Sequence, residues 1–251
     1  MAHPFVRRAA RISGTLLIAA GCLTLVWAIV VWRWQDPFTA LYTHFEQEHL
    51  AREYQQQTAA FKPRVRLLPH SHTQVADLAV AEKAVAADAA AYRQSLKVGG
   101  PVGRLTIGRI GLHMIVVQGT DEQTLEKGPG HYLQSALPGE GRLIYVAGHR
   151  TTYLAPFSRI NDIRDGDYIT FELPYATFTY RAFRHYIVRA TDLRVLVNHG
   201  QEILRLQACH PRFFATHRYI LDARLVYFVP RGSKHRFTVP SAAVTSARTP
   251  S

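Results

Sequence analysis

Residues 204–212 read LRLQACHPR, and this stretch says more about the 251-residue chain than any other. Leu204 and Leu206 alternate with polar residues, which is the pattern of a β-strand with one buried face. The run ends at Cys209, and nine positions later Arg218 opens another apolar run, RYIL. A strand end holds a thiol nucleophile in a fixed place. A guanidinium on a neighbouring strand can stabilise the negative charge that develops when the thiol attacks a carbonyl.

A histidine ends a second apolar run sixty residues before the cysteine. Residues 143–150 read LIYVAGHR, so His149 follows an apolar stretch much as Cys209 does. Cysteine, histidine and arginine at three strand ends supply a nucleophile, a general acid–base and an oxyanion donor. The sequence therefore predicts thiol-based acyl transfer.

Length and composition predict one domain of ordinary size with appendages. Apolar residues make up 47% of the chain, which is enough for a sizeable core and excludes global disorder. The net charge of +12 would suit a nucleic acid or an anionic surface. Much of that charge, however, lies near the two ends of the chain: Arg7, Arg8, Arg11, Arg231, Lys234, Arg236 and Arg248. Because no recognition helix or aromatic-basic motif accompanies it, we expect no nucleic acid partner.

The amino-terminal region predicts a single-pass membrane anchor over residues 12–34. Residues 12–32 carry no charge, and 21 helical residues at about 1.5 Å each span a bilayer core of about 30 Å. Arginines precede this run, so the positive-inside rule keeps residues 1–11 in the cytoplasm and exports the rest from the plasma membrane. A cleaved signal peptide is the rival interpretation. The exit into WRWQDP, without small residues, favours the uncleaved anchor.

The two cysteines lie in different regions of the chain. Cys22 lies inside the expected anchor, so Cys209 is the one thiol of the exported region. Thiols in that compartment usually form disulfides, and a lone one is either buried and inert or reactive. The histidine and arginine around Cys209 favour the reactive interpretation.

The segment 35–100 predicts a stalk between anchor and domain. Residues 37–61 and the alanine-rich residues 74–96 show helical patterns, separated by Pro63 and Pro69. A helical hairpin and a flexible spacer both fit this composition. His70 and His72 flank Ser71 in the break, where no carboxylate or cysteine cluster accompanies them, so we interpret them as loop residues rather than metal ligands.

Beyond Gly99-Gly100-Pro101 the pattern changes to short β-rich runs with turn signals, which is typical of a sandwich or barrel and predicts a mainly β domain over residues 101–229. We expect strands at 103–107, 114–118, 143–147, 168–172, 177–189, 203–209 and 218–229. Short helices are expected at 120–127 and 155–160. The polar residues 230–251 predict a mobile tail.

These residues resemble the sortases, the membrane-anchored cysteine transpeptidases of Gram-positive bacteria. The resemblance covers roughly residues 102–229 and rests on GRIGL at 108–112, KGPGHY at 127–132, AGHRTTY at 147–153 and CHPRF at 209–213. The sequence around His149 and Cys209 is most similar to that of class E sortases, the housekeeping type common in high-GC actinobacteria. The resemblance implies a closed β-barrel of about eight strands with short helices. We expect no cofactor, and neither a bound metal nor the calcium site of some sortases can be inferred from this chain.

The resemblance also assigns catalytic roles. It implies that Cys209 attacks the Thr–Gly carbonyl of a sorting signal on a secreted protein, and that His149 protonates the leaving amine and then activates the incoming one. Arg218 would donate to the oxyanion or to the substrate backbone. A thioester intermediate would allow a cell-wall precursor or peptidoglycan amine to accept the protein.

The similarity to class E also suggests which residues bind the substrate. Similarity to class E suggests a Leu-Ala-x-Thr-Gly signal, with Tyr132 filling the space that proline would need. Leu193, Val195 and Leu196, before the cysteine strand, are candidates for holding the leucine. The usual family signature is Thr-Leu-x-Thr-Cys, whereas Arg205 and Ala208 replace both threonines here. Because the position before the cysteine faces the substrate region in the family, Ala208 could alter which signal is preferred.

Alternatives remain open at this point. His131 and His210 compete with His149, although strand alternation should turn His210 away from the face of Cys209. Arg212 competes with Arg218, whereas Arg224 lies about 20 Å along the strand from it. For the whole chain, the alternatives are a Cys–His hydrolase of cell-wall peptides and an inactive surface-assembly module. Papain-like hydrolases place their cysteine before the histidine and at a helix start, unlike this chain.

Overall fold

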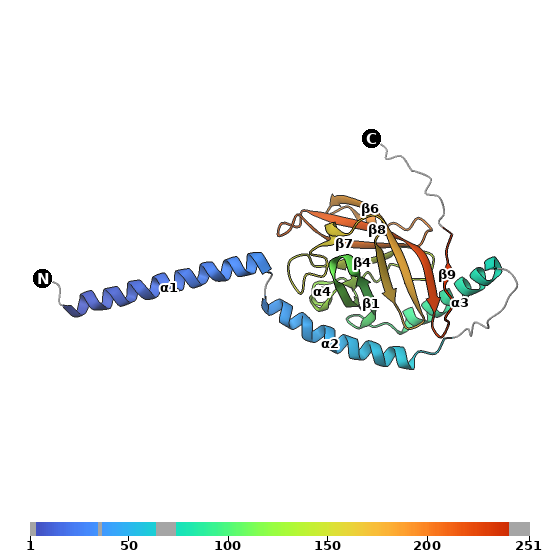
Figure 1. The fold of residues 1–251 in the computed structure, drawn as a ribbon, viewed down its shortest axis with the longest axis horizontal. Coiled ribbons are helices and arrows are strands. Elements are labelled where there is room, and N and C mark those ends of the chain that lie inside the picture. Colours follow the sequence, from blue (N-terminus) through green and yellow to red (C-terminus); the bar gives the residue numbers. More distant parts are fainter. Residues whose placement is uncertain (1–3, 35–36, 64–73, 241–251) are drawn as a thin grey trace, which may run out of the picture.

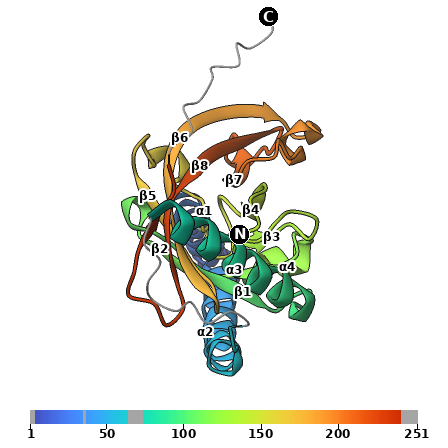
Figure 2. The same ribbon diagram turned by 90° about the vertical axis from the view of Figure 1, so that its right-hand side faces the viewer.

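The computed structural model describes residues 4–34, 37–63 and 74–240. A long helix, α1 (Pro4–Trp34), extends away from a β-barrel, and two further helices, α2 (Pro37–Ala60) and α3 (Gln74–Ser95), lie along the barrel (Figure 1). Figure 2 shows the molecule turned by 90°, with α2 at the bottom and the long strands β6 and β8 at the top.

Eight strands close the barrel and a ninth extends it. The strands are β1 (Pro101–Ile107), β2 (Leu112–Gln118), β3 (Gly130–His131), β4 (Ile144–Gly148), β5 (Tyr168–Glu172), β6 (Ala176–Arg189), β7 (Ile203–His210), β8 (His217–Pro230) and β9 (Phe237–Thr238). Their order is β6-β5-β1-β2-β3-β4-β7-β8-β9, and pairing of β6 with β8 closes the ring. The predicted closed barrel of about eight strands is therefore confirmed.

One of the two short helices that the sequence predicts forms, and the other does not. Helix α4 (Glu122–Lys127) forms as expected, capped by the Asp121 side chain, and the remaining turns are 3-10: η1 (Gly108–Ile110), η2 (Ile160–Asp162) and η3 (Leu193–Leu196). The helix predicted over residues 155–160 is wrong. Tyr153 and Leu154, which precede this segment, and Ala155, its first residue, all have positive φ, which L residues rarely adopt, so the chain turns there and does not begin a helix.

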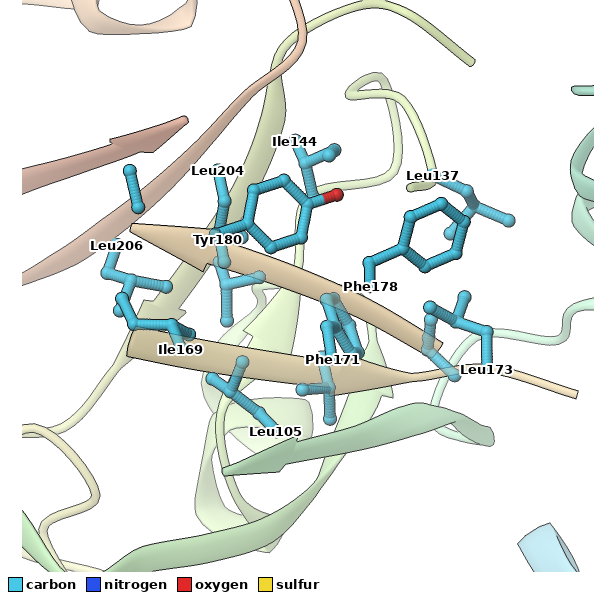
Figure 3. Packing of buried hydrophobic residues seen from close by; sticks show 14 of the residues in the cluster. Leu105, Leu137, Ile144, Ile169, Phe171, Leu173, Phe178, Tyr180, Leu204 and Leu206 are labelled. Atoms are coloured by element: carbon cyan, nitrogen blue, oxygen red, sulfur yellow. The ribbon is translucent and has the colours of Figure 1, made fainter. Parts of the chain in front are cut away.

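Alternating side chains fill the barrel. Leu204 and Leu206 of β7 have no exposed surface, and with Ile144, Phe171 and Phe178 they form the core (Figure 3). Residues on the opposite face of β7 therefore point outward. That outward face carries Cys209.

Both helices of segment 35–100 pack on the barrel. The Tyr54 hydroxyl of α2 donates to the Glu172 carbonyl at 2.9 Å, and that of Tyr92 in α3 donates to the Val102 carbonyl at 2.9 Å. The alanine-rich pattern of α3 has a packing reason: Ala81 and Ala89 are fully buried, and small side chains let the helix approach the sheet closely. The segment expected as a stalk thus contributes side chains to the core of the domain.

The expected tail is partly structured. Strand β9 pairs with β8, joining Thr238 to Tyr227 and Phe237 to Phe228. Arg231 donates to the carbonyls of Phe61 and Pro174 at 3.3 and 3.2 Å. Residues 241–251, and His70 and His72 of the expected loop, lie outside the described residues.

Helix α1 is apolar and exposed. Its segment Arg8–Val30 has a mean hydropathy of 2.0, and none of it is buried against the rest of the protein. Within the described part of the chain it is the one helix long and apolar enough to cross a membrane, and a signal sequence would have the same properties. Two residues, 35 and 36, separate it from α2.

Candidate active site

The register of three neighbouring strands brings the predicted cysteine, histidine and arginine together. Strand β4 pairs with β7 in parallel, and the last pair of this ladder is Gly148 with Ala208, so His149 and Cys209 are the residues that come next on the two chains. Strand β8 pairs with β7 antiparallel, and Arg218 is the direct partner of Cys209. Paired residues point to the same face and adjacent strands lie about 4.8 Å apart. Cys209 and Arg218 therefore share the outward face of the sheet, and His149 follows the end of β4 at the same end of the barrel.

Cys209 is a half-buried free thiol. Its backbone carbonyl accepts a hydrogen bond from Nη1 of Arg150 at 3.1 Å. The residues that follow, 211–216, form an exposed loop in which Phe213 and Ala215 have positive φ. The thiol thus lies where a stiff strand ends and a strained surface loop begins.

The His149 imidazole is shielded but not fully paired. Its Nε2 is buried and has no hydrogen-bond partner among the described residues, and its ring lies 5.2 Å from that of Tyr153. Burial lowers the pKa of His149, although the carboxylates of Glu126 and Glu122 act against this. The ring is therefore neutral near pH 7, and an unpaired nitrogen is available to take up a proton.

Helix α2 supports the loop over His149. The Tyr153 hydroxyl donates to Oε1 of Glu126 at 2.9 Å, and the Tyr153 amide donates to Oγ1 of Thr39 at 3.2 Å. Thr43 donates to the Glu126 carbonyl at 2.7 Å. Since Thr39 and Thr43 belong to α2, this helix fixes both the tyrosine and the carboxylate beside His149.

The Arg218 side chain braces the loop after Cys209. Its Nη1 donates to the carbonyls of Ala215 at 2.7 Å and His217 at 3.0 Å. Arg218 is paired with Cys209 and so leaves β8 on the same face as the thiol, and its guanidinium carries five N–H donors, more than these two bonds use. Arg212, its rival, donates to the Ser158 carbonyl, and Arg224 pairs with Ile203 at the far end of β7.

Arg150 is a residue that the sequence analysis missed. It is buried, and its guanidinium contacts the Cys209 carbonyl, Nδ1 of His210 at 2.9 Å and Oδ1 of Asn161 at 2.8 Å. Burial and the charge of Arg212 lower its pKa. Its place directly after His149 was the available signal. The partner carbonyl, however, lies 59 residues away, which no local pattern reveals.

The two rival histidines have other partners. His131 is fully buried, with Nδ1 2.9 Å from Oε1 of Gln118 and Nε2 2.9 Å from the Ala136 carbonyl. Burial lowers its pKa to about 4. His210 lies against Arg150 and, at 6.2 Å, the Tyr219 ring. Neither shares the outward face of Cys209, because His131 is buried and His210 is the next residue along β7.

A pocket of about 280 Å³ lies between the residues that follow β3 and the turn η3, and Cys209, His149 and Arg218 are not among its lining residues. Three of the predicted substrate-binding residues, Tyr132, Leu193 and Leu196, line it. Tyr132 also meets the Tyr145 ring edge-on at 6.1 Å. The structure thus joins Tyr132 to the segment before the cysteine strand.

Two other predicted binding residues are placed elsewhere. Ala208 has no exposed surface because it points into the barrel core, as strand alternation beside an outward Cys209 demands. The Val195 side chain is 7% exposed and packs against Tyr145 and Ile220 beneath the pocket. Neither side chain lines the pocket, and both are packed inside the protein.

No group of three or more His, Cys, Asp or Glu side chains that could hold a metal ion occurs within residues 4–34, 37–63 and 74–240.

Comparison with known proteins identifies the family. Residues 105–226 match the model of the sortase domain. Sortase D of Bacillus subtilis (strain 168) is 35% identical over 145 residues, which cover 55% of this chain and 72% of that protein. The chain therefore belongs to the sortase family, and it is a sortase-type cysteine transpeptidase.

Solved structures share the fold. The Sortase D5 transpeptidase of Clostridium perfringens matches with a TM-score of 0.55 at 21% identity, over 72% of this chain and 98% of that one. Sortase E1 of Streptomyces coelicolor, solved with a tripeptide in its active site, matches with a TM-score of 0.50 at 24% identity, over 53% of this chain and 92% of that one. At these identities the likeness concerns the fold, and it spans more than one sortase class.

Proposed function

We propose that Cys209, His149 and Arg218 form the catalytic centre of this sortase, and that it moves secreted proteins from a sorting signal to a cell-wall amine. The observation that supports the proposal is the strand register: Arg218 is the direct partner of Cys209, and His149 follows the last pair of the β4–β7 ladder, next to the residue before Cys209. Family membership supplies the class of substrate, a protein with a sorting signal.

The proposed reaction proceeds in two balanced steps. First, the Cys209 thiol gives its proton to His149, and the sulfur attacks the carbonyl carbon between threonine and glycine. The C–N bond breaks, His149 gives the proton to the departing amine, and a thioester remains. Then the incoming amine attacks the thioester, its proton passes through His149 to the departing sulfur, and a new amide forms. Arg218 stabilises the oxyanion in both steps.

For the signal itself we propose the Leu-Ala-x-Thr-Gly type, as in class E. The pocket lined by Tyr132, Leu193 and Leu196 supports this proposal because it offers apolar surface for the leucine beside an aromatic ring. Its lining residue Tyr132 contacts Tyr145 of β4, which pairs with Arg205, a residue on the same face of β7 as Cys209.

Substitution of the three residues tests the catalytic centre. With a Leu-Ala-x-Thr-Gly peptide, mass spectrometry should find the acyl group on Cys209 of the wild-type protein and none on Cys209→Ala. His149→Ala and Arg218→Ala should each lose on the order of a hundredfold in rate. As the control, Arg212→Ala should lose much less. A larger loss for Arg212→Ala than for Arg218→Ala would contradict the oxyanion assignment, and release of free acid without amine transfer would indicate a hydrolase.

We also propose that α1 anchors the domain on the outer side of the plasma membrane, with residues 1–11 in the cytoplasm. The exposed apolar surface of α1 and the arginines before it support this. Protease added to spheroplasts should then remove the domain from the cells. Release of intact domain during growth, with a new amino terminus near Trp34, would instead demonstrate a cleaved signal peptide.

A further inference from the structure

Arg205 forms a buried polar contact on the same face of β7 as Cys209, four residues earlier. Its guanidinium donates to both oxygens of Asp222, from Nε at 2.6 Å and from Nη2 at 2.9 Å. Its Nη1 donates to the Val195 carbonyl at 2.5 Å. Arg205 is 5% exposed and Asp222 is fully buried, so these bonds are made out of contact with solvent.

This charge pair is well satisfied. Burial by itself lowers the pKa of Arg205, but the hydrogen bonds and charge of Asp222 outweigh burial and raise it. The Tyr186 ring lies 5.8 Å from the guanidinium carbon. Arg184 also contacts Asp222, at 2.5 Å, but from the surface, where its side chain is 55% exposed. Two arginines thus share one carboxylate, and of the two only Arg205 is bonded to Val195 among the described contacts.

The Val195 carbonyl belongs to η3, the turn that forms one side of the pocket. Leu193 and Leu196 of η3 line the pocket, whereas the Val195 side chain packs against Tyr145 and Ile220. The turn is therefore held from below in two ways, by an apolar side chain and by a hydrogen bond to Arg205. Removing the bond would leave both a buried carbonyl and part of a buried guanidinium without partners.

We propose that Arg205 is a positioning residue for substrate recognition: through the Val195 carbonyl it fixes η3, and so it fixes the distance between Leu193 and Leu196 on one side of the pocket and Tyr132 on the other. Asp222 orients the guanidinium for this contact. Arg205 does not itself touch the substrate. The part of this inference that concerns peptide binding rests on the proposed function, whereas the restraint on η3 does not.

The test compares Arg205→Lys with Arg184→Lys. Lysine keeps the charge, but its single ammonium cannot bond both Asp222 oxygens and the Val195 carbonyl in the fixed geometry of a guanidinium. The same change at Arg184 alters the same carboxylate without touching η3. We expect hydrogen exchange at the amides of residues 193–197 to become about tenfold faster in Arg205→Lys and to stay within twofold in Arg184→Lys.

Kinetics with a Leu-Ala-x-Thr-Gly peptide supply the second measurement. In Arg205→Lys we expect KM to rise about tenfold, while kcat and the rate of Cys209 alkylation by iodoacetamide change less than twofold. Unchanged exchange and KM in a folded Arg205→Lys protein would overturn the proposal, as would a loss confined to kcat.

A double variant keeps the test decisive if Arg205→Lys does not fold. Combining Arg205→Met with Asp222→Leu removes the whole buried pair, an exchange that proteins often tolerate. This variant should show the same faster exchange of residues 193–197, and normal exchange in it would overturn the restraint. Should the wild-type protein form no thioester with any sorting peptide, the proposed function would fail, while the exchange experiment would still decide the role of Arg205.

Discussion

Positive charge surrounds the proposed nucleophile. Arg150 donates a hydrogen bond to the carbonyl of Cys209. Arg218, on the neighbouring strand β8, is the direct pairing partner of Cys209. The neighbouring imidazole, His149, has its pKa lowered by burial and is neutral near pH 7. A neutral base beside two fixed cations suits a reaction in which negative charge develops on the thiol and then on the substrate oxygen.

His131 predicts a pH dependence of stability. Its pKa is about 4 in the folded protein and about 6.5 in the unfolded chain, so the unfolded chain takes up a proton first as the pH falls. Stability is then lost between about pH 6.5 and 4, by on the order of 3 kcal/mol, and is fully present above that range. Urea unfolding of the wild type and His131→Gln at pH 7.5 and pH 4.5 measures this. The exposed His199→Gln serves as the control.

The result expected for His131→Gln is lower stability at pH 7.5 but a smaller loss on acidification than in the wild type. His149 contributes to the remaining dependence because its pKa is also lowered. The same acid-induced loss in both proteins would show that His131 is not responsible.

At the residue scale, spacing along the strands was enough to single out Cys209, His149 and Arg218 together. It was not enough for Arg150, whose partners all lie at least 11 residues away. It also could not show which flanking residues point inward. Ala208 is in the core because its neighbour Cys209 faces out, and which face is buried depends on how the sheet closes.

The register of β7 is the feature of element scale on which the site depends. A shift by one residue would bury Cys209 and turn Ala208 outward, because successive side chains alternate. The buried Arg205–Asp222 pair opposes such a shift, since these residues are direct partners in the β7–β8 ladder.

The pocket between β3 and η3 predicts a selectivity. If Tyr132 excludes the proline of Leu-Pro-x-Thr-Gly, then Tyr132→Ala should narrow the preference for the alanine peptide, because the space it filled becomes open. Such pocket effects amount to about 1–3 kcal/mol, so the wild-type preference should be tens-fold at most. Cleavage rates of the two peptides by both proteins provide the ratio. The same ratio in both proteins would assign Tyr132 a packing role beside Tyr145.

Long strands were predictable and short ones were not. The expected strands at 168–172, 203–209 and 218–229 differ from β5, β7 and β8 by at most one residue at either end. Strands β3 and β9 have two residues each, too few to show alternation, and form because the neighbouring ladders hold them. The missed turn at 153–155 has no glycine to mark its positive φ values.

At the scale of the whole molecule, the barrel and the helices α2 and α3 form one folded unit. Leu50 and Tyr54 of α2 and Val85 and Tyr92 of α3 are each at most 5% exposed. Composition alone had left a flexible spacer equally open, because a polar and alanine-rich segment shows its apolar partners only in the assembled fold.

A shortened protein tests this. Compared with a protein that begins at Pro37, one that begins at Gly99 lacks α2 and α3 and leaves their apolar contacts on the barrel open. Each large buried side chain contributes about 1.5–3 kcal/mol, so we expect Tm to fall by at least about 10 °C. Thermal unfolding and binding of an apolar dye measure the effect. Equal Tm values would show that the barrel is stable without the helices.

The two-residue connection between α1 and α2 limits where the enzyme can work. Three peptide steps reach at most roughly 11 Å, and Thr39, two residues into α2, already contacts the loop over His149. If α1 lies in a bilayer, as proposed, the catalytic end therefore searches a thin layer over the lipid surface rather than the volume of the compartment. Molecules held in that layer meet the enzyme at a high local concentration, while freely diffusing ones are diluted away from it. Rates measured with free peptides and a detached enzyme would accordingly underestimate its turnover on tethered substrates.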